Sequence, residues 1–245
     1  MKKSYIIIGM VVIVMLVAIG IYAVINSNSQ SKKQSKENST NIEGTTNTEN
    51  STKENNTENK DEYIQNNQIS NESEENNMYS TGKHHAEIVV KNYGTIALEL
   101  DADVAPITVE NFANLVNEGF YNGLTFHRII SGFMIQGGDP LGNGTGGSSK
   151  TIKGEFASNG VKNSISHVRG TISMARSSMP NSASSQFFIV HQDSTFLDGK
   201  YAAFGTVTSG MEVVDKICAD TAVEDDNGTV AKNNQPVIEK ITIID

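Results

Sequence analysis

The sequence has a single cysteine, Cys218, among its 245 residues, so an intramolecular disulfide is excluded. Cys218 follows Val213, Val214 and Ile217 in a helical apolar pattern, which predicts a buried structural thiol rather than a reactive one. Positive charge is also scarce. Only 19 lysines and arginines stand against 28 acidic residues, and the net charge of −9 argues against nucleic acid as a partner.

Motifs that bind phosphate, metal or an acyl group are missing or incomplete. Residues 142–147 match GxGxxG, but Ser-Ser-Lys follows where a helix should begin, so we expect no dinucleotide site. The histidines of the C-terminal part lack the spacing of metal ligands. Asp139 and Glu155 form only a nominal glycosidase pair, and no nucleophile elbow is present. The sequence therefore predicts no cofactor and no metal.

An uncharged apolar run from Tyr5 to Ile25 predicts a membrane-spanning helix near the start of the chain. At about 1.5 Å per residue, such a helix spans roughly 30 Å, the thickness of a bilayer core. A cleaved signal peptide is the alternative, although no clear A-x-A site precedes Asn26. Lys2 and Lys3 favour an N-terminus inside the cell. The sequence thus predicts a single-pass protein of the cell membrane whose C-terminal part lies outside the cytoplasm.

Composition divides the rest of the chain into two parts. Residues 26–85 are dominated by Asn, Ser, Thr, Glu, Lys and Gln, and such a segment cannot bury enough apolar surface to offset chain entropy. We predict a disordered linker here, with His84 and His85 in a flexible junction. All nine phenylalanines and all four prolines come later. Residues 86–245 are therefore predicted to form one globular domain, and residues 1–25 the membrane anchor.

The pattern of this domain predicts many short strands and two helices. Residues 86–100 are typical of two strands joined by a turn at Asn92, Tyr93 and Gly94. Helices are predicted at residues 106–118, which begin with a proline, and at residues 209–219. Further strand-like runs occupy residues 124–130, 133–136, 170–175, 186–191, 202–207 and 237–244. Many short strands with two helices indicate a mainly β fold, a closed antiparallel barrel.

Arg128 lies near Phe126, Phe133 and Met134, with Gln136 close behind. A permanent charge among apolar neighbours is costly to hold away from water, and a protein that keeps one there usually uses it on a ligand. Because side chains alternate along a strand, we expect Arg128 to share a face with Phe126, and Met134 to share a face with Gln136. Taken alone, an arginine on a strand is most often a solvated residue of the outer face.

The strand-like run at residues 186–191 makes a matching prediction. Gln186 and Phe188 should share the ligand face, and Phe187 and Ile189 should face the core. Glutamines in such positions could also simply bond loop backbone. A cation, two amides and apolar walls together fit the recognition of a neutral, partly apolar substrate that carries a carbonyl.

The domain from Ala86 to Asp245 resembles the cyclophilin family of peptidyl-prolyl cis–trans isomerases over nearly its whole length. Five stretches match family motifs in the family's order: FHRIISGFMIQGGD, NGTGG, SMAR, SQFFI and FLDGK. Together they are highly specific. The resemblance implies an eight-stranded antiparallel barrel that is closed at its ends by two α-helices.

The resemblance also implies a role for each matching position. Arg128 matches the catalytic arginine, and Gln136 matches the amide that orients the arginine and the substrate. The walls of the proline pocket match Phe133, Met134, Phe188 and Leu197. The rim that holds neighbouring residues of the peptide matches Gly144, Ala175, Arg176, Ser177 and Gln186.

Three substrate-binding positions depart from the common family pattern. Phe196 stands where the family often has a tryptophan that aids binding of cyclosporin, so only weak cyclosporin binding is expected. Tyr201 stands where histidine is frequent, so a phenol must make that contact or the contact is lost. Arg176 stands where asparagine is frequent, which predicts a more basic rim.

These residues together predict a peptidyl-prolyl cis–trans isomerase that accelerates X-Pro rotation in exported proteins and assists their folding outside the cytoplasm. Its expected partners are proline-containing polypeptides and, through residues 5–25, the membrane. The alternative is a proline-peptide binding module with little turnover. A surface adhesin or spacer, in which the pocket has no role, is a third hypothesis.

Overall fold

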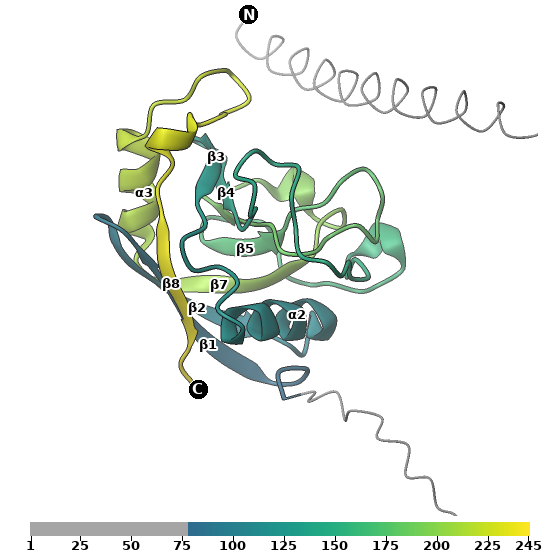
Figure 1. Ribbon diagram of the computed structural model, residues 1–245. Coiled ribbons are helices and arrows are strands. Elements are labelled where there is room, and N and C mark those ends of the chain that lie inside the picture. Colours follow the sequence, from purple (N-terminus) through teal and green to yellow (C-terminus); the bar gives the residue numbers. More distant parts are fainter. Residues whose placement is uncertain (1–77) are drawn as a thin grey trace, which may run out of the picture. The chain divides into compact units, whose positions relative to one another are not determined.

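The computed structural model describes residues 78–245, which form a mainly β domain with two α-helices (Figure 1). The predicted anchor and residues 26–77 of the predicted linker lie outside the described residues. Within residues 78–245, no helix is both long enough and apolar enough to cross a membrane.

Eight strands form one sheet, and each corresponds to a strand predicted from the sequence. They are β1 (Lys83–Val90), β2 (Gly94–Asp101), β3 (Phe126–Ile130), β4 (Met134–Gly137), β5 (Thr171–Met174), β6 (Phe187–Val190), β7 (Ala203–Ser209) and β8 (Ile238–Ile243). Their order in the sheet is β3-β4-β6-β5-β7-β2-β1-β8, and all neighbours pair antiparallel. The mainly β prediction is confirmed.

The sheet curls so that its first and last strands approach each other. The backbone N–H groups of Gly123 and Phe126 donate to the carbonyls of Ile238 and Pro236 at 2.8 and 2.9 Å. An isolated antiparallel bridge joins residues 125 and 237 in the same region. These contacts connect the segment that leads into β3 with the segment that leads into β8.

Helix α2 (Pro106–Asn117) begins at a proline, as predicted, and turns Val109, Phe112 and other apolar side chains into the core. The carboxylate of Glu155 accepts hydrogen bonds from the backbone N–H groups of Ile107 and Thr108 at 3.1 and 2.8 Å. It thereby satisfies donors that a helix N-terminus leaves unpaired. Glu155 is therefore a structural residue and not half of a glycosidase pair.

Helix α3 (Met211–Asp220) buries Val213, Val214 and Ile217 against the sheet. Cys218 is half-buried at the margin of the core. Burial raises the pKa of the Cys218 thiol to about 11, with a smaller contribution from the nearby Asp215 carboxylate. The thiol stays protonated at neutral pH, as the predicted structural role requires.

The apolar side chains form two separate clusters. The main core fills the curled sheet and contains Phe112, Phe126 and Phe187, whose rings lie 5.7 to 6.1 Å apart in two edge-on pairs. The second, smaller group is named here the pocket cluster and consists of Met134, Phe188, Val190 and Leu197, with Ile130, Phe133, Ala175 and Tyr201 packed against it. Residues 187 and 189 lie in the main core and residue 188 in the pocket cluster, so the alternation predicted for β6 is confirmed.

Alternation fails in β3, and the prediction that Arg128 and Phe126 share a face is wrong. The register between β3 and β4 shifts between these two residues, which is the mark of a β-bulge. Phe126 is fully buried in the main core, whereas Arg128 contacts Met134 of the pocket cluster. The extra residue in the bulge turns the arginine away from the core, and a sequence pattern with period two does not anticipate it.

The domain also begins earlier than predicted, and the placement of His84 and His85 in a flexible junction is wrong. Strand β1 starts at Lys83, and both histidines pair with residues of β2. The side chain of Asp245 bonds the imidazole Nδ1 of His84 and accepts from the backbone N–H of His85 at 2.6 Å. A contact with the last residue of the chain thus helps to fix the start of the first strand.

Candidate active site

Arg128 projects from β3, opposite Gln136 of β4, and its guanidinium is held at three nitrogens. Nε donates to the backbone carbonyl of Asn227 at 2.8 Å, and one terminal nitrogen donates to the side-chain oxygen of Asn227 at 3.1 Å. The other terminal nitrogen lies 3.4 Å from Oε1 of Gln136 and 3.9 Å from the sulfur of Met134. The charge is therefore fixed in one plane directly beside the pocket cluster.

The loop that carries Asn227 is clamped onto β3. Asp225 accepts hydrogen bonds from the backbone N–H and the hydroxyl of Thr229 at 3.0 and 2.8 Å. The N–H of Ile129 donates to the carbonyl of Gly228 at 2.8 Å. Gly228 has a φ of +81°, and a Cβ there would lie 2.3 Å from the carbonyl oxygen of Ile129, so only glycine fits this approach.

Sequence reasoning missed Asn227. The run Asp-Asp-Asn-Gly-Thr at residues 225–229 does signal a tight turn. Nothing in that signal shows that the turn folds against an arginine 99 positions earlier.

Burial lowers the pKa of Arg128, while the nearby Tyr201 and Asp225 oppose that shift. Arginine remains protonated in proteins at neutral pH, so the group is a partly desolvated, permanent cation. Such a charge interacts more strongly with a nearby dipole than it would in water.

The pocket cluster supplies an apolar surface next to this cation. Met134, Phe188 and Leu197 are buried, and Phe133 lies at the edge, with its ring centroid 5.7 Å from that of Phe196. Phe196 as a whole is 47% exposed, so it can contact a ligand. The structure therefore brings together all the predicted pocket walls, which come from β4 and the turn that precedes it, from β6 and from the 3₁₀-helix η2 (Thr195–Leu197).

Tyr201 packs edge-on against Phe188, with ring centroids 5.9 Å apart. The guanidinium carbon of Arg176 lies 4.7 Å from the centroid of the Tyr201 ring, and Arg176 also donates to the carbonyl of Lys200 at 2.9 and 2.7 Å. Arg176 is thus engaged with the protein itself. Its cation lies over the rings of Phe156 and Tyr201, 4.9 and 4.7 Å from their centroids, where it supports Tyr201 and helps to fix the segment around residue 200.

The two predicted glutamines form a chain of amides along the rim. Nε2 of Gln136 donates to Oε1 of Gln186 at 2.9 Å. Nε2 of Gln186 in turn donates to the carbonyls of Gly144 and Gly146 at 3.1 and 2.7 Å. Because Gln136 also faces Arg128, this chain of amides connects the guanidinium to the glycine-rich segment at residues 142–147, named here the glycine loop.

Asp139 holds the glycine loop in place through hydrogen bonds to its backbone. Its buried carboxylate accepts backbone N–H bonds from Leu141, Asn143 and Gly144 at 2.8, 3.0 and 2.6 Å. Burial alone would raise the pKa of Asp139, but these N–H donors outweigh it and hold the pKa below its ordinary value. Asp139, like Glu155, is a structural carboxylate rather than a general acid.

The rim encloses a cavity of about 220 Å³ beside the amide chain. It is lined by Gln136, Gly144, Thr145, Gly146, Ala175, Arg176, Ser177, Ser182, Ser184 and Gln186. The five rim residues that the sequence predicted are all among them. Within residues 78–245, no group of three or more His, Cys, Asp or Glu side chains is arranged to hold a metal ion.

Comparisons with known proteins are consistent with this geometry. A sequence model of the family described as "Cyclophilin type peptidyl-prolyl cis-trans isomerase/CLD" matches residues 85–244. The chain is 51% identical over 128 residues to a peptidyl-prolyl cis-trans isomerase of Helicobacter pylori, a match that covers 51% of this chain and 76% of that protein. It is 50% identical over 117 residues to peptidyl-prolyl cis-trans isomerase B of Bacillus subtilis, covering 48% of this chain and 78% of the relative.

A solved structure shows a similar fold. It is the crystal structure of a Cryptosporidium parvum cyclophilin type peptidyl-prolyl cis-trans isomerase in the presence of the dipeptide Ala-Pro. The two chains are 32% identical, with a TM-score of 0.58, and the match covers 66% of this chain and 99% of the other.

Proposed function

The chain belongs to the cyclophilin-type peptidyl-prolyl cis–trans isomerases, and we propose that Arg128 beside the pocket cluster is the group that accelerates X-Pro rotation. The observation that carries this assignment is the fixed guanidinium, whose terminal nitrogen lies 3.9 Å from the sulfur of Met134 in the pocket wall. A proline ring held against that wall places its amide next to the cation.

The reaction needs no covalent step. Rotation about a peptide C–N bond has a barrier of about 18–20 kcal/mol because resonance gives the bond double-bond character. In the twisted state, resonance is lost and the nitrogen holds a lone pair. A donor near that nitrogen stabilises the twisted state more than either planar isomer, and this difference lowers the barrier.

The bonds to Asn227 and Gln136 keep the guanidinium in place during the rotation. Its Nε and one terminal nitrogen are engaged by Asn227, so the fork cannot turn freely, and the second terminal nitrogen faces the pocket side near Met134. A preorganised donor requires little rearrangement as the lone pair develops. Lysine lacks this planar fork and is more strongly hydrated.

The pocket cluster would hold the proline ring while the carbonyl side of the bond rotates. Phe133, Met134, Phe188 and Leu197 form its apolar walls. The chain of amides and the rim cavity would hold the residues that precede proline, chiefly through backbone contacts. Proline-containing polypeptides are accordingly the proposed substrates.

Cyclosporin would bind only weakly. Phe196 presents an exposed ring at the pocket edge but has no indole N–H to donate a hydrogen bond.

The uncharged run from Tyr5 to Ile25 supports a membrane anchor, and we place the isomerase outside the cytoplasm, where exported chains fold. Proline isomerisation limits the folding of many chains, so such clients would benefit. The contacts between the β3 and β8 ends of the sheet support the closed barrel that the family resemblance implies. Protease protection on intact cells tests the location: digestion of the C-terminal domain by external protease is expected, and full protection would contradict it.

Exchange spectroscopy on an X-Pro peptide tests the activity itself. A substoichiometric amount of the full-length protein should speed the exchange between the cis and trans signals of the peptide. The X-Pro peptide should also bind the wild-type protein saturably. Binding without faster exchange would instead favour the proline-peptide binding module.

A further inference from the structure

Two buried side chains, His167 and Ser173, form a row with the more exposed Asp198 next to the pocket cluster. Nδ1 of His167 lies 2.8 Å from an oxygen of Asp198, and Nε2 lies 3.0 Å from the hydroxyl of Ser173. This is the order Asp–His–Ser of a serine hydrolase triad. However, Ser173 is 0% exposed and lies in β5 between Phe188 of β6 and Ala203 of β7. No substrate carbonyl reaches that hydroxyl, so the row must serve another purpose.

The hydrogen bonds fix the protonation state of His167. A carboxylate can only accept, so the bond to Asp198 requires the proton on Nδ1. Nε2 is then the acceptor of the Ser173 hydroxyl proton. Burial lowers the pKa of His167, although Asp198 opposes the shift, so the ring is neutral at physiological pH. Both nitrogens of this fully buried imidazole are satisfied only in the Nδ1–H tautomer.

Asp198 connects His167 to the strap, residues 194–198, which includes η2. Its carboxylate also accepts from the backbone N–H of His167 at 2.8 Å and from the hydroxyl of Ser166 at 2.6 Å. At the other end of the strap, the N–H of Ser194 donates to the carbonyl of His167 at 2.7 Å. Both ends of the strap are therefore tied to residues 166 and 167.

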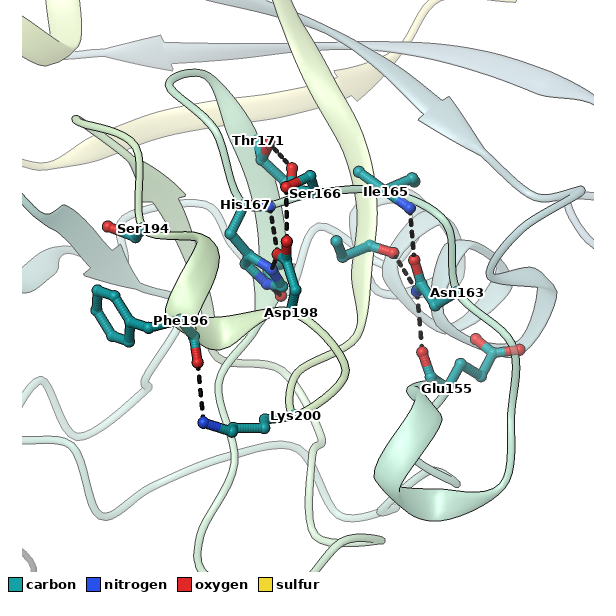
Figure 2. A network of polar contacts seen from close by, with 12 residues as sticks. Glu155, Asn163, Ile165, Ser166, His167, Thr171, Ser194, Phe196, Asp198 and Lys200 are labelled. Atoms are coloured by element: carbon teal, nitrogen blue, oxygen red, sulfur yellow. Dashed lines mark hydrogen bonds and ion pairs between the residues drawn. The ribbon is translucent and has the colours of Figure 1, made fainter.

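The strap carries two residues of the proposed pocket. Leu197 is a buried member of the pocket cluster, and the Phe196 ring packs at a tilt against that of Phe133. Figure 2 shows the Asp198 carboxylate directed at Ser166 and His167, while the ring of Phe196 points away from them. The anchoring carboxylate of Asp198, which caps η2, and the Phe196 ring thus point in different directions from the strap.

The imidazole supports a second wall through its face. Its ring is stacked nearly parallel to Phe188, with an interplanar angle of 17° and a centroid distance of 6.0 Å. One side chain therefore touches Phe188 directly and fixes Leu197 and Phe196 through Asp198.

We propose that His167, in its neutral Nδ1–H form, is a positioning residue that sets the shape of the proline pocket by holding the strap and the Phe188 wall at the same time. This rests on the proposed function of the pocket cluster in binding proline. His167 touches neither the proposed substrate nor Arg128. It acts on binding of the prolyl group and not on stabilisation of the twisted amide.

The expected effect is on KM. His167→Ala removes the imidazole bond to Asp198 and the support of Phe188, while the backbone bonds of residue 167 and the Ser166 hydroxyl still hold the strap. KM for an X-Pro peptide should rise about tenfold. The kcat of the folded enzyme should change less than about twofold, because Arg128 keeps its bonds to Asn227 and Gln136. In His167→Asn the amide N–H can still reach Asp198, so KM should rise by only about threefold.

His84→Asn is the matched control. His84 also bonds an aspartate, Asp245, through Nδ1 and packs against an aromatic ring, that of Tyr79. It lies in β1 and is not part of the pocket cluster. Its KM and kcat should equal those of the wild type. All variants are measured as full-length chains, with kcat referred to the folded fraction.

Nitrogen-15 chemical shifts of the wild-type imidazoles provide a readout that does not depend on a variant's folding. His167 should show the Nδ1–H tautomer at pH 7. An Nε2–H tautomer, or a KM that stays at the wild-type value in both His167 variants, would overturn the inference. A wild-type chain that fails to speed X-Pro exchange would instead overturn the proposed function, so the two failures are distinguishable.

Discussion

Asn227 holds the guanidinium of Arg128 at two points, through its backbone carbonyl at 2.8 Å and its side-chain oxygen at 3.1 Å. The two residues are 99 positions apart in the sequence. The contact means that the orientation of the proposed catalytic group depends on a loop that carries none of the family motifs noted in the sequence. It also gives the loop a measurable role in turnover.

Asn227→Ala removes the side-chain bond to Arg128 and leaves the backbone bond. We expect kcat/KM to fall by about tenfold, because one hydrogen bond to a charged group contributes about 1.5–3 kcal/mol and part of it is regained by water. Steady-state assay of an X-Pro peptide measures the loss. Asn233→Ala changes an exposed asparagine of the 3₁₀-helix η3 (Lys232–Asn234) and should leave kcat/KM unchanged. Equal rates in all three chains would show that the contact does not orient Arg128.

The stability of the fold should fall as pH drops from about 7 towards 5. Burial lowers the pKa of His127, against the pull of Asp139 and with help from Arg128, and burial also lowers the pKa of His167, against the pull of Asp198. The unfolded chain therefore takes up protons near pH 6.5 while the folded chain does not, so falling pH favours unfolding. For each histidine, the free energy of unfolding changes by at most about 1.4 kcal/mol per pH unit.

Denaturant unfolding at pH 7.5 and 5.5 tests this sign. The wild type should be less stable at pH 5.5, and the double variant His127→Asn/His167→Asn should lose most of that difference. Greater stability of the wild type at pH 5.5, or an equal pH dependence in the double variant, would contradict the assignment of these two histidines.

Phe196→Trp should strengthen cyclosporin binding by about tenfold or more, since the indole adds an N–H donor and a larger ring at an exposed pocket edge. Inhibition of isomerase activity measures the affinity. The uninhibited kcat/KM should stay within about twofold of the wild type, because Arg128 and the buried pocket walls are unchanged. An unaltered inhibition constant would mean that residue 196 does not limit cyclosporin binding.

The strands and helices could be read from the sequence because each is fixed by local features. Pro106 begins α2, Gly119 follows its end with a positive φ, and the alternation around Phe187 and Phe188 separates the main core from the pocket cluster. The motifs around Arg128 and Gln186 predict the pocket-wall and rim residues that the structure brings together, but not Asn227. Each of these signals is local and involves only a few neighbouring residues.

Features that depend on long-range contacts could not be read in this way. The β-bulge that separates Phe126 from Arg128 is a property of strand pairing, and no residue of β3 indicates it in the sequence. His84 pairs with Leu100 of β2, and its side chain bonds Asp245, 161 positions later. His167 carried no recognisable signal, since its partner Asp198 lies 31 positions later. In each case the missing information is a partner that is distant in sequence.

The role of Arg128 is tested most directly by comparing binding and catalysis in Arg128→Ala and Arg128→Lys. Both variants should still bind a prolyl peptide within about threefold of the wild-type Kd, because the apolar walls remain. Their kcat/KM for X-Pro rotation should fall by about a hundredfold or more, since the oriented donor to the amide nitrogen is lost. Wild-type turnover by folded Arg128→Ala would contradict the account.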